Sequence, residues 1–477
     1  MSAQATLRKG VILALACAAQ FMVVLDVAIV NVALPSIQEE LDVGQNDLQW
    51  IVIGYGLMLG GFLLLGGRLA DLLGRRRILL TGLVLFSAAS LLAGLAESAD
   101  VLIGARGLQG LGAALIPPAA LSILAVTFAD GRERHRAIGL YGAVTGVSAS
   151  VGVIASGLLT DSAGWHWIFL INVPIGVLLI TMAAVYLPAE AGGRRGSGGF
   201  DVAGAVTVTG GLLLLVYGLS RAADVGWGSS STLGVFAAAV ATLAAFVLIE
   251  RRSRSPLVPG SAVRNRTSVA ANLAAFFTFA AFFAFIFLGS LLMQQVLGYS
   301  PTRTGVAWLA TTATSFVAAA ITGGKLVAVV GVRRLLVIGQ TLLAVSVLVL
   351  TRIPADAHFA TDLLPALLLA GVAGGIAAPA AQIGALSGVA PSLTGLASGL
   401  VETLREIGGA VGVAAASTVL VSRAGLPAFH AAFWVICVVA ALGALAAATT
   451  FPRRGTPATY PDLPRSDILL AGVDEAI

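Results

Sequence analysis

The sequence predicts an all-α membrane protein with fourteen membrane-spanning helices, arranged as two six-helix bundles with two inserted central helices. Three observations support this fold class. Of the 477 residues, 58% are hydrophobic and 11% are charged, whereas soluble domains carry about 25% charged residues. The apolar residues form runs of about 20 residues, the length that crosses a bilayer as a helix. A charged, glycine-rich motif also occurs once in each half of the chain, as in duplicated membrane proteins.

The first bundle is expected within residues 1–190, with spans at about 11–33, 48–67, 78–96, 101–128, 137–160 and 167–187. Its first apolar run follows Arg8 and Lys9 and continues to Pro35, beyond a signal-peptide cleavage site, which favours an uncleaved helix. A connector at 191–266 holds two further spans, at about 202–220 and 232–249.

The second bundle is expected at 267–451, with spans at about 268–297, 304–330, 334–351, 361–388, 394–421 and 428–450. The proline-rich tail, 452–477, has too little apolar content to pack, and we expect it to be disordered and cytoplasmic.

The repeated motif runs from Gly66 to Arg77 and again from Gly323 to Arg334. Both copies keep a glycine pair, a base, a leucine, a later glycine and trailing arginines, but Ala328 replaces Asp71 in the second copy. We expect a tight turn between helices, in which glycines permit close approach. Asp71 can pair there with an arginine or lie against a helix N-terminus. The residues predicted to form a conformational gating motif are Gly67, Arg68, Asp71, Gly74 and Arg75.

Lysine and arginine residues predict the orientation. With both termini in the cytoplasm, only Arg221, Arg303, Arg352 and Arg423 of the 28 bases fall in external loops, and Arg106 and Arg405 fall within spans. The remaining bases lie on the inner face, which is the bias seen in membrane proteins. The sequence therefore predicts a multi-pass protein of the cell membrane. The net charge of +5 reflects the arginines and lysines of the inner loops and does not indicate a nucleic-acid partner.

Two charges deep in the first bundle are candidates for proton coupling, because a charge inside the membrane is costly. Asp26 has no base within a turn of its own helix, so burial should favour its neutral, protonated form. Its alternative role is a structural hydrogen bond to another helix. Arg106 lies in a glycine-rich helix face and can tune Asp26 or a substrate; alternatively, it reaches outward to the membrane surface.

In the thirteenth span, Glu402, Arg405 and Glu406 follow one another at helical spacing. Glu402 and Glu406 are further candidates for proton coupling. A self-neutralising cluster near the inner membrane edge is an equally good interpretation, because residues three and four apart share one helix face. In the fifth span, the glycines Gly142, Gly146, Gly152 and Gly157 predict close helix packing and do not themselves identify a function.

Other classes of function find little support in the sequence. The two cysteines lie in apolar runs and the four histidines are scattered, so no metal or other cofactor is expected and an enzyme is disfavoured. A phosphate-binding glycine-rich loop for ATP is also missing from the sequence. A membrane-embedded enzyme and a sensor remain weaker alternatives.

Several motifs together resemble the major facilitator superfamily, and within it the 14-helix drug:proton antiporters of the EmrB/QacA type. The segment Gly67–Arg77 is similar to the signature between the second and third helices of that superfamily. Leu25–Pro35 resembles the first-helix motif, Arg106–Gly110 the fourth-helix motif, and Trp165–Pro174 the start of the sixth helix. The fifth helix departs from the family pattern. Gly152-Val153 stands in place of the usual Gly-Pro, so the helix-bending proline is missing, and Ser156-Gly157 stands in place of the Gly-Gly pair that follows.

The resemblance implies two domains rocking around a central cavity and a proton-coupled exporter of amphipathic small molecules such as drugs and antibiotics. Its expected partners are the small-molecule substrate, protons and the lipid bilayer, and it is expected to work as a monomer. The alternative is a nutrient or metabolite importer or facilitator on the same fold.

Overall fold

The computed structural model describes residues 3–42, 45–129, 131–188, 201–253, 256–421 and 425–452. In these ranges, thirteen helices are long and apolar enough to cross a membrane. The helix α5 (Arg132–Ala163) packs among them, against α1 (Ala3–Leu41) and α12 (Pro301–Ile321), and is long enough to be the fourteenth. The predicted all-α membrane fold is confirmed.

The first half of the chain forms one group of packed helices. After α1 come α2 (Gln45–Leu73), α3 (Arg75–Gly94), α4 (Ala99–Thr127) and α5, and the last span consists of two pieces, α6 (His166–Leu170) and α7 (Asn172–Tyr186). The helix α4 packs against α1, α2 and α3, while α7 packs against α3 and α1. Side chains from α1, α3, α4 and α7 can therefore meet inside this group.

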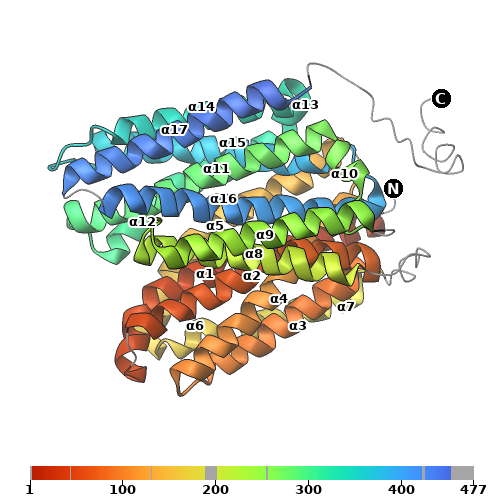
Figure 1. Cartoon of the computed structure of the whole chain (residues 1–477), viewed down its shortest axis with the longest axis horizontal. Coiled ribbons are helices and arrows are strands. Elements are labelled where there is room, and N and C mark those ends of the chain that lie inside the picture. Colours follow the sequence, from red (N-terminus) through yellow and green to blue (C-terminus); the bar gives the residue numbers. More distant parts are fainter. Residues whose placement is uncertain are drawn as a thin grey trace, which may run out of the picture.

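The second half repeats the arrangement. It contains α11 (Arg266–Leu291), α12, α14 (Val332–Leu350), α15 (Leu364–Leu386), α16 (Thr394–Val421) and α17 (Leu426–Thr450). Short pieces extend these helices: η1 (Leu292–Val296), η2 (Thr322–Leu326) with α13 (Val327–Val330), η3 (Phe359–Leu363) and η4 (Pro391–Leu393). The short helix α10 (Gly260–Arg264) precedes α11. In Figure 1, α14, α15 and α17 lie in the upper part of the molecule and α3, α4, α6 and α7 in the lower part.

The inserted helices α8 (Val202–Val225) and α9 (Ser230–Arg252) pack against each other and run through the middle of the view in Figure 1, between α16 and α2. The helix α8 contacts both α2 and α16, so the inserted pair touches both halves. Gly60 and Gly61 of α2 face Val216 and Leu213 of α8; a Cβ on Gly61 would approach the Leu213 side chain to 2.4 Å. The missing side chains of α2 thus allow α8 to lie close to it.

Several helices extend beyond the predicted spans. The first continues through Pro35 to Leu41, and α5 starts at Arg132 rather than near residue 137. These additions are polar helix ends that a hydropathy pattern does not detect, although backbone hydrogen bonding continues through them. Residues 453–477, which make up nearly all of the expected disordered tail, lie outside the described part of the chain. The boundaries of the four predicted segments stay predictions.

Candidate functional site

The carboxylate of Asp26 lies fully buried between four helices of the first group. Its Oδ2 accepts a hydrogen bond from Arg106 Nη1 of α4 at 2.5 Å, and its Oδ1 accepts from Gln109 Nε2 at 2.6 Å and from Asn172 Nδ2 of α7 at 3.0 Å. Gln109 Nε2 also lies 2.8 Å from Ser90 Oγ of α3. We call these five residues, Asp26, Ser90, Arg106, Gln109 and Asn172, the Asp26 network.

Arg106 is held on several sides besides its ion pair. Its Nε donates to the carbonyl oxygen of Ile51 at 3.1 Å, and its Nη1 lies 2.6 Å from Gln109 Oε1. The guanidinium lies over the ring of Tyr55, 4.2 Å from the centroid, a favourable position for a cation. Only 1% of the residue is exposed. Arg106 therefore turns into the helix group and does not reach the membrane surface.

The Asp26 network changes the expectation formed for Asp26 from its own helix. Its base comes from α4, 80 residues away in the sequence, and side-chain amides of α4 and α7 also donate to the carboxylate. Ser90, Asn172 and Tyr55 were missed as site residues. Asn172 lies in the motif at the start of the sixth helix, and that motif could have marked it as a site residue. Ser90 and Tyr55 lie in no motif that would have identified them.

A second charged cluster lies in α16 of the second helix group. Arg405 Nη1 is 2.7 Å from Glu402 Oε2, and Arg405 Nη2 is 2.9 Å from Glu406 Oε1. The Glu402 pair is close but not aligned for a hydrogen bond, and Gln382 Nε2 of α15 donates to the other Glu402 oxygen at 3.3 Å. The Glu402 cluster, made of Gln382, Glu402, Arg405 and Glu406, carries one more negative than positive charge.

The acids of the Glu402 cluster lie well inside α16 and differ in exposure. The helix α16 begins at Thr394, so a rise of about 1.5 Å per residue places Glu402 about 12 Å and Glu406 about 18 Å inside it. The Glu402 side chain is 1% exposed, whereas that of Glu406 is 25% exposed. The cluster therefore neutralises itself only in part, and Glu406 is its accessible acid.

Asp71 joins the two helix groups. Its Oδ1 and Oδ2 accept hydrogen bonds from the backbone N–H groups of Gly395 and Leu396, each at 2.8 Å. These groups belong to the first turn of α16, where a carboxylate is stabilised by the helix dipole. We call this contact the Asp71 latch.

Arg75 reinforces the Asp71 latch from α3. Its Nη2 donates to the carbonyl oxygen of Pro391 and lies 3.7 Å from Asp71 Oδ1, while its Nε donates to Ser122 Oγ of α4 at 2.9 Å. Arg68, the other predicted partner of Asp71, instead donates to Pro256 O of the connector at 3.2 Å. The latch thus combines a helix N-terminus with one arginine.

The predicted turn is shorter than its motif. The helix α2 continues to Leu73 and α3 begins at Arg75, so that only Gly74, with φ of 100°, breaks the helices. Gly67 lies inside α2 against α16, where a Cβ would be 2.2 Å from Gly395 O. In the second copy, Gly323 lies in η2 against α5, and a Cβ there would be 2.4 Å from His135 O. Each copy therefore packs a glycine against a helix of the other group.

The glycines of α5 serve different contacts. Gly152 faces α1 beside Asp26, and a Cβ on it would lie 3.0 Å from Leu25 O. Gly142 faces the other helix group, where Gln382 Oε1 would be 3.2 Å from such a Cβ. Gly146 and Gly157 lie in α5, but their surroundings are outside the described part of the structure.

The structure thus holds buried carboxylates in both helix groups and a polar contact between the groups. Protonation of Asp26 removes the charge that balances Arg106, and so weakens contacts joining α1, α4 and α7. The Asp71 latch is a second polar contact that must break if the groups separate at that end. These are the elements of a membrane transporter with two moving halves.

The chain belongs to the Major Facilitator Superfamily, whose family model matches residues 16–305 and 271–466. Two solved structures share its fold. The human organic anion transporter MFSD10 has a TM-score of 0.68 at 16% identity, covering 92% of this chain and 99% of its own. The proton:xylose symporter XylE has a TM-score of 0.65 at 15% identity, covering 92% and 95%. The expected major facilitator fold is confirmed.

Relatives by sequence include resistance and export proteins. The puromycin resistance protein pur8 of Streptomyces alboniger is 37% identical over 376 residues, covering 78% of this chain and 74% of its own. The tetracenomycin C resistance and export protein of Streptomyces glaucescens is 35% identical over 392 residues, covering 77% and 72%. The cephamycin export protein CmcT of Amycolatopsis lactamdurans is 39% identical over 298 residues, covering 62% and 61%. The expected relation to drug exporters is confirmed at the level of the family.

Proposed function

We propose that this protein exports amphipathic small molecules, including antibiotics, across the cell membrane in exchange for protons. Membership in the superfamily and the names of its relatives support the transport class. The observation that carries proton coupling is the buried Asp26 carboxylate, which accepts bonds from Arg106, Gln109 and Asn172 of two other helices. A charge held this way affects helix contacts when it titrates.

In the proposed cycle, Asp26 takes a proton from the outside and releases it to the cytoplasm. The protonated acid no longer balances Arg106, so α1 can shift relative to α4 and α7. A substrate that competes with the proton for the ionised site couples the two flows. A membrane potential of 100 mV adds about 2.3 kcal/mol for each charge moved inward.

The Glu402 cluster is proposed to act as a second proton-coupling region. Glu406 is the acid that exchanges, because its side chain is 25% exposed, whereas Glu402 is buried against Arg405 and Gln382. Protonation of Glu406 would leave one carboxylate and one guanidinium, a neutral pair. The charge of the cluster therefore changes without leaving an isolated buried ion.

The gating motif is proposed to keep the cytoplasmic ends of the two groups together in one state. Gly395 and Leu396 donate to Asp71 in the present arrangement, and the latch must open when the protein faces inward. We place both termini in the cytoplasm, because most arginines then lie on the inner face, and we propose that the monomer is the working unit.

Transport direction tests this proposal. Inverted membrane vesicles from a pump-deficient host, with and without the protein, are given an inward-acidic gradient and puromycin, lincomycin or ethidium as probes. Export predicts accumulation of at least one probe inside the vesicles, abolished by a protonophore. An importer or facilitator would not accumulate a probe under this gradient, and recovery of a chemically altered probe would instead indicate an enzyme.

A further inference from the structure

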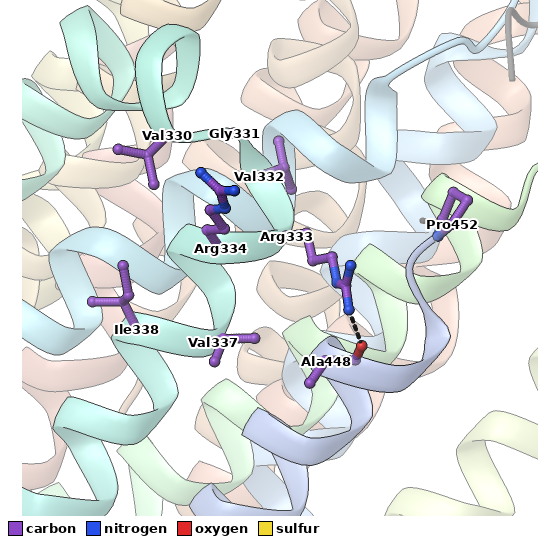
Figure 2. A pocket seen from close by; sticks show the side chains of 9 residues that line it. All are labelled: Val330, Gly331, Val332, Arg333, Arg334, Val337, Ile338, Ala448 and Pro452. Atoms are coloured by element: carbon purple, nitrogen blue, oxygen red, sulfur yellow. Dashed lines mark hydrogen bonds between the residues drawn. The ribbon is translucent and has the colours of Figure 1, made fainter. Parts of the chain in front are cut away.

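A cleft of about 950 Å³ lies at the edge of the second helix group. Its lining includes no residue of the Asp26 network or of the Glu402 cluster. The start of α14 and the end of α17 form its walls. Figure 2 shows the residues that line it, which include Arg333, Arg334, Val337, Ile338, Ala448 and Pro452. The lining contains two arginines and lacks acidic residues, so its charge is positive.

The two arginines are held differently. Arg333 Nη2 donates to the carbonyl oxygen of Ala448 at 2.5 Å, which ties α14 to α17 and leaves other N–H groups of the guanidinium for a ligand (Figure 2). Arg334 is exposed and points toward the Val330 side of the cleft. Among the described residues it has neither a hydrogen-bond nor an ion-pair partner. The cleft therefore offers guanidinium donors that no described residue of the protein uses.

The position of the cleft relates it to the membrane. The candidate spans of α14 and α17 begin at Val332 and end at Thr450, so the two arginines lie at the ends of these spans, where a helix is expected to leave the bilayer. Ile338 lies one turn deeper than Arg334 on the same helix face and is 42% exposed, and Leu445 of α17 is 59% exposed. Such exposed apolar side chains within a span face lipid. This arrangement matches a phospholipid, whose headgroup would meet the guanidinium groups and whose acyl chain would lie along the apolar walls.

We propose that the Arg333–Arg334 cleft binds an anionic phospholipid of the inner leaflet. The arginines hold the phosphate, since guanidinium groups form paired hydrogen bonds with phosphate oxygens, and Val337 and Ile338 contact the upper acyl chain. A soluble phosphate would use the arginines but not the apolar wall. The acidic C-terminal residues Asp462, Asp467, Asp474 and Glu475 are another source of negative charge, and the experiment below separates them from the lipid.

Native mass spectrometry of the purified full chain tests this proposal, with phosphatidylglycerol or phosphatidylcholine of identical acyl chains as the probe. The variants are Arg334→Gln and Arg333→Gln with Arg334→Gln. Arg334→Gln is the cleaner change, because the Arg333 bond to Ala448 remains. The matched control is Arg251→Gln with Arg252→Gln, two consecutive exposed arginines at the end of α9 that do not line the cleft.

Wild type should retain phosphatidylglycerol in preference to phosphatidylcholine. Each arginine removed should weaken that binding about fivefold, and the pair about thirtyfold, since one base near an anionic lipid contributes about 1 kcal/mol. The Arg251 and Arg252 control should bind as wild type does. Equal retention of both lipids, or unchanged binding by the double variant, would refute the site.

Two further arms separate the lipid from other anions. Glycerol 3-phosphate should fail to displace phosphatidylglycerol at equal concentration, because it lacks the chain that meets Ile338; efficient displacement would identify a soluble-anion site and overturn the lipid assignment. Replacing the four acidic tail residues by their amides should leave lipid binding unchanged. A tenfold gain in binding would instead show that the tail occupies the cleft.

Discussion

Asp26 and Arg106 form a fully buried ion pair between α1 and α4, with 2.5 Å between carboxylate and guanidinium. Both partners have further hydrogen bonds, so neither depends on the other alone for solvation. Loss of one charge from such a pair commonly costs about 3–5 kcal/mol because the other stays buried and uncompensated. The same sensitivity makes the pair a means of converting protonation into movement.

Asp26→Asn should abolish substrate-induced proton release and uphill export while the protein still reaches the membrane. The amide keeps an acceptor for Gln109 or Asn172 but cannot titrate, and its NH₂ group opposes Arg106. We therefore also expect a lower melting temperature. Proton release from vesicles and thermal melting are measured on the same preparation, with Asp100→Asn, an exposed acid at the start of α4, as the control. Uphill export with unchanged pH dependence would make Asp26 structural.

Glu406→Gln and Glu402→Gln should behave differently. Glu406→Gln should lower the melting temperature less than Glu402→Gln does, because the Glu406 side chain is 25% exposed, yet the variant should release fewer protons per substrate. Glu402→Gln should lower the melting temperature, since Glu402 is buried beside Arg405. Both variants are compared by melting and proton-release assays. Unchanged proton release by Glu406→Gln would remove it from the coupling route.

Asp71→Asn should impair transport by weakening the Asp71 latch. The change removes a carboxylate from the N-terminus of α16, where a partly buried charge contributes up to about 2 kcal/mol. The backbone N–H groups of Gly395 and Leu396 donate hydrogen bonds to Asp71. Their hydrogen exchange should therefore accelerate about tenfold or more in the variant. Asp356→Asn, at an exposed site, serves as the control. Unchanged exchange together with normal export would show that the Asp71 contact plays no part in gating.

Gly67→Ala should disrupt transport by steric conflict, because the added methyl group would lie 2.2 Å from Gly395 O. Overpacking of this kind typically costs about 1–3 kcal/mol, and here it acts only while α2 and α16 are together. Gly56→Ala on the same helix is the matched control, since nothing lies within 4 Å of its Cβ position. Export rates of the two variants are compared at equal expression, and only Gly67→Ala should lose activity. Equal loss in both variants would indicate a general effect of alanine on the helix.

The orientation can be checked with reporter fusions. A reporter after Arg454 should register in the cytoplasm and one inserted in Asp224–Ser230 outside, because the distribution of arginines favours that arrangement. Protease protection of the same fusions is an independent measurement. Opposite signals at both sites would overturn the orientation.

The sequence could predict the features that depend on hydropathy, repetition and isolated charge. Asp26 and Arg106 stand out because each interrupts an apolar run, and the repeat locates Gly67 and Gly323. Partners from distant helices could not be found this way, since the rotation of α3 and α7 that brings Ser90 and Asn172 to Asp26 is set by packing. The extent of α2 was similarly hidden, because its last turn is polar and only Gly74 interrupts the helix.

The helix α8 lies against both α2 and α16, and α9 lies against α8. The inserted pair therefore covers one side of the contact between α2 of the first helix group and α16 of the second. An amphipathic molecule that approaches through the lipid on this side encounters α8 and α9 before the α2–α16 contact. The extra helices therefore separate this part of the α2–α16 contact from the surrounding lipid.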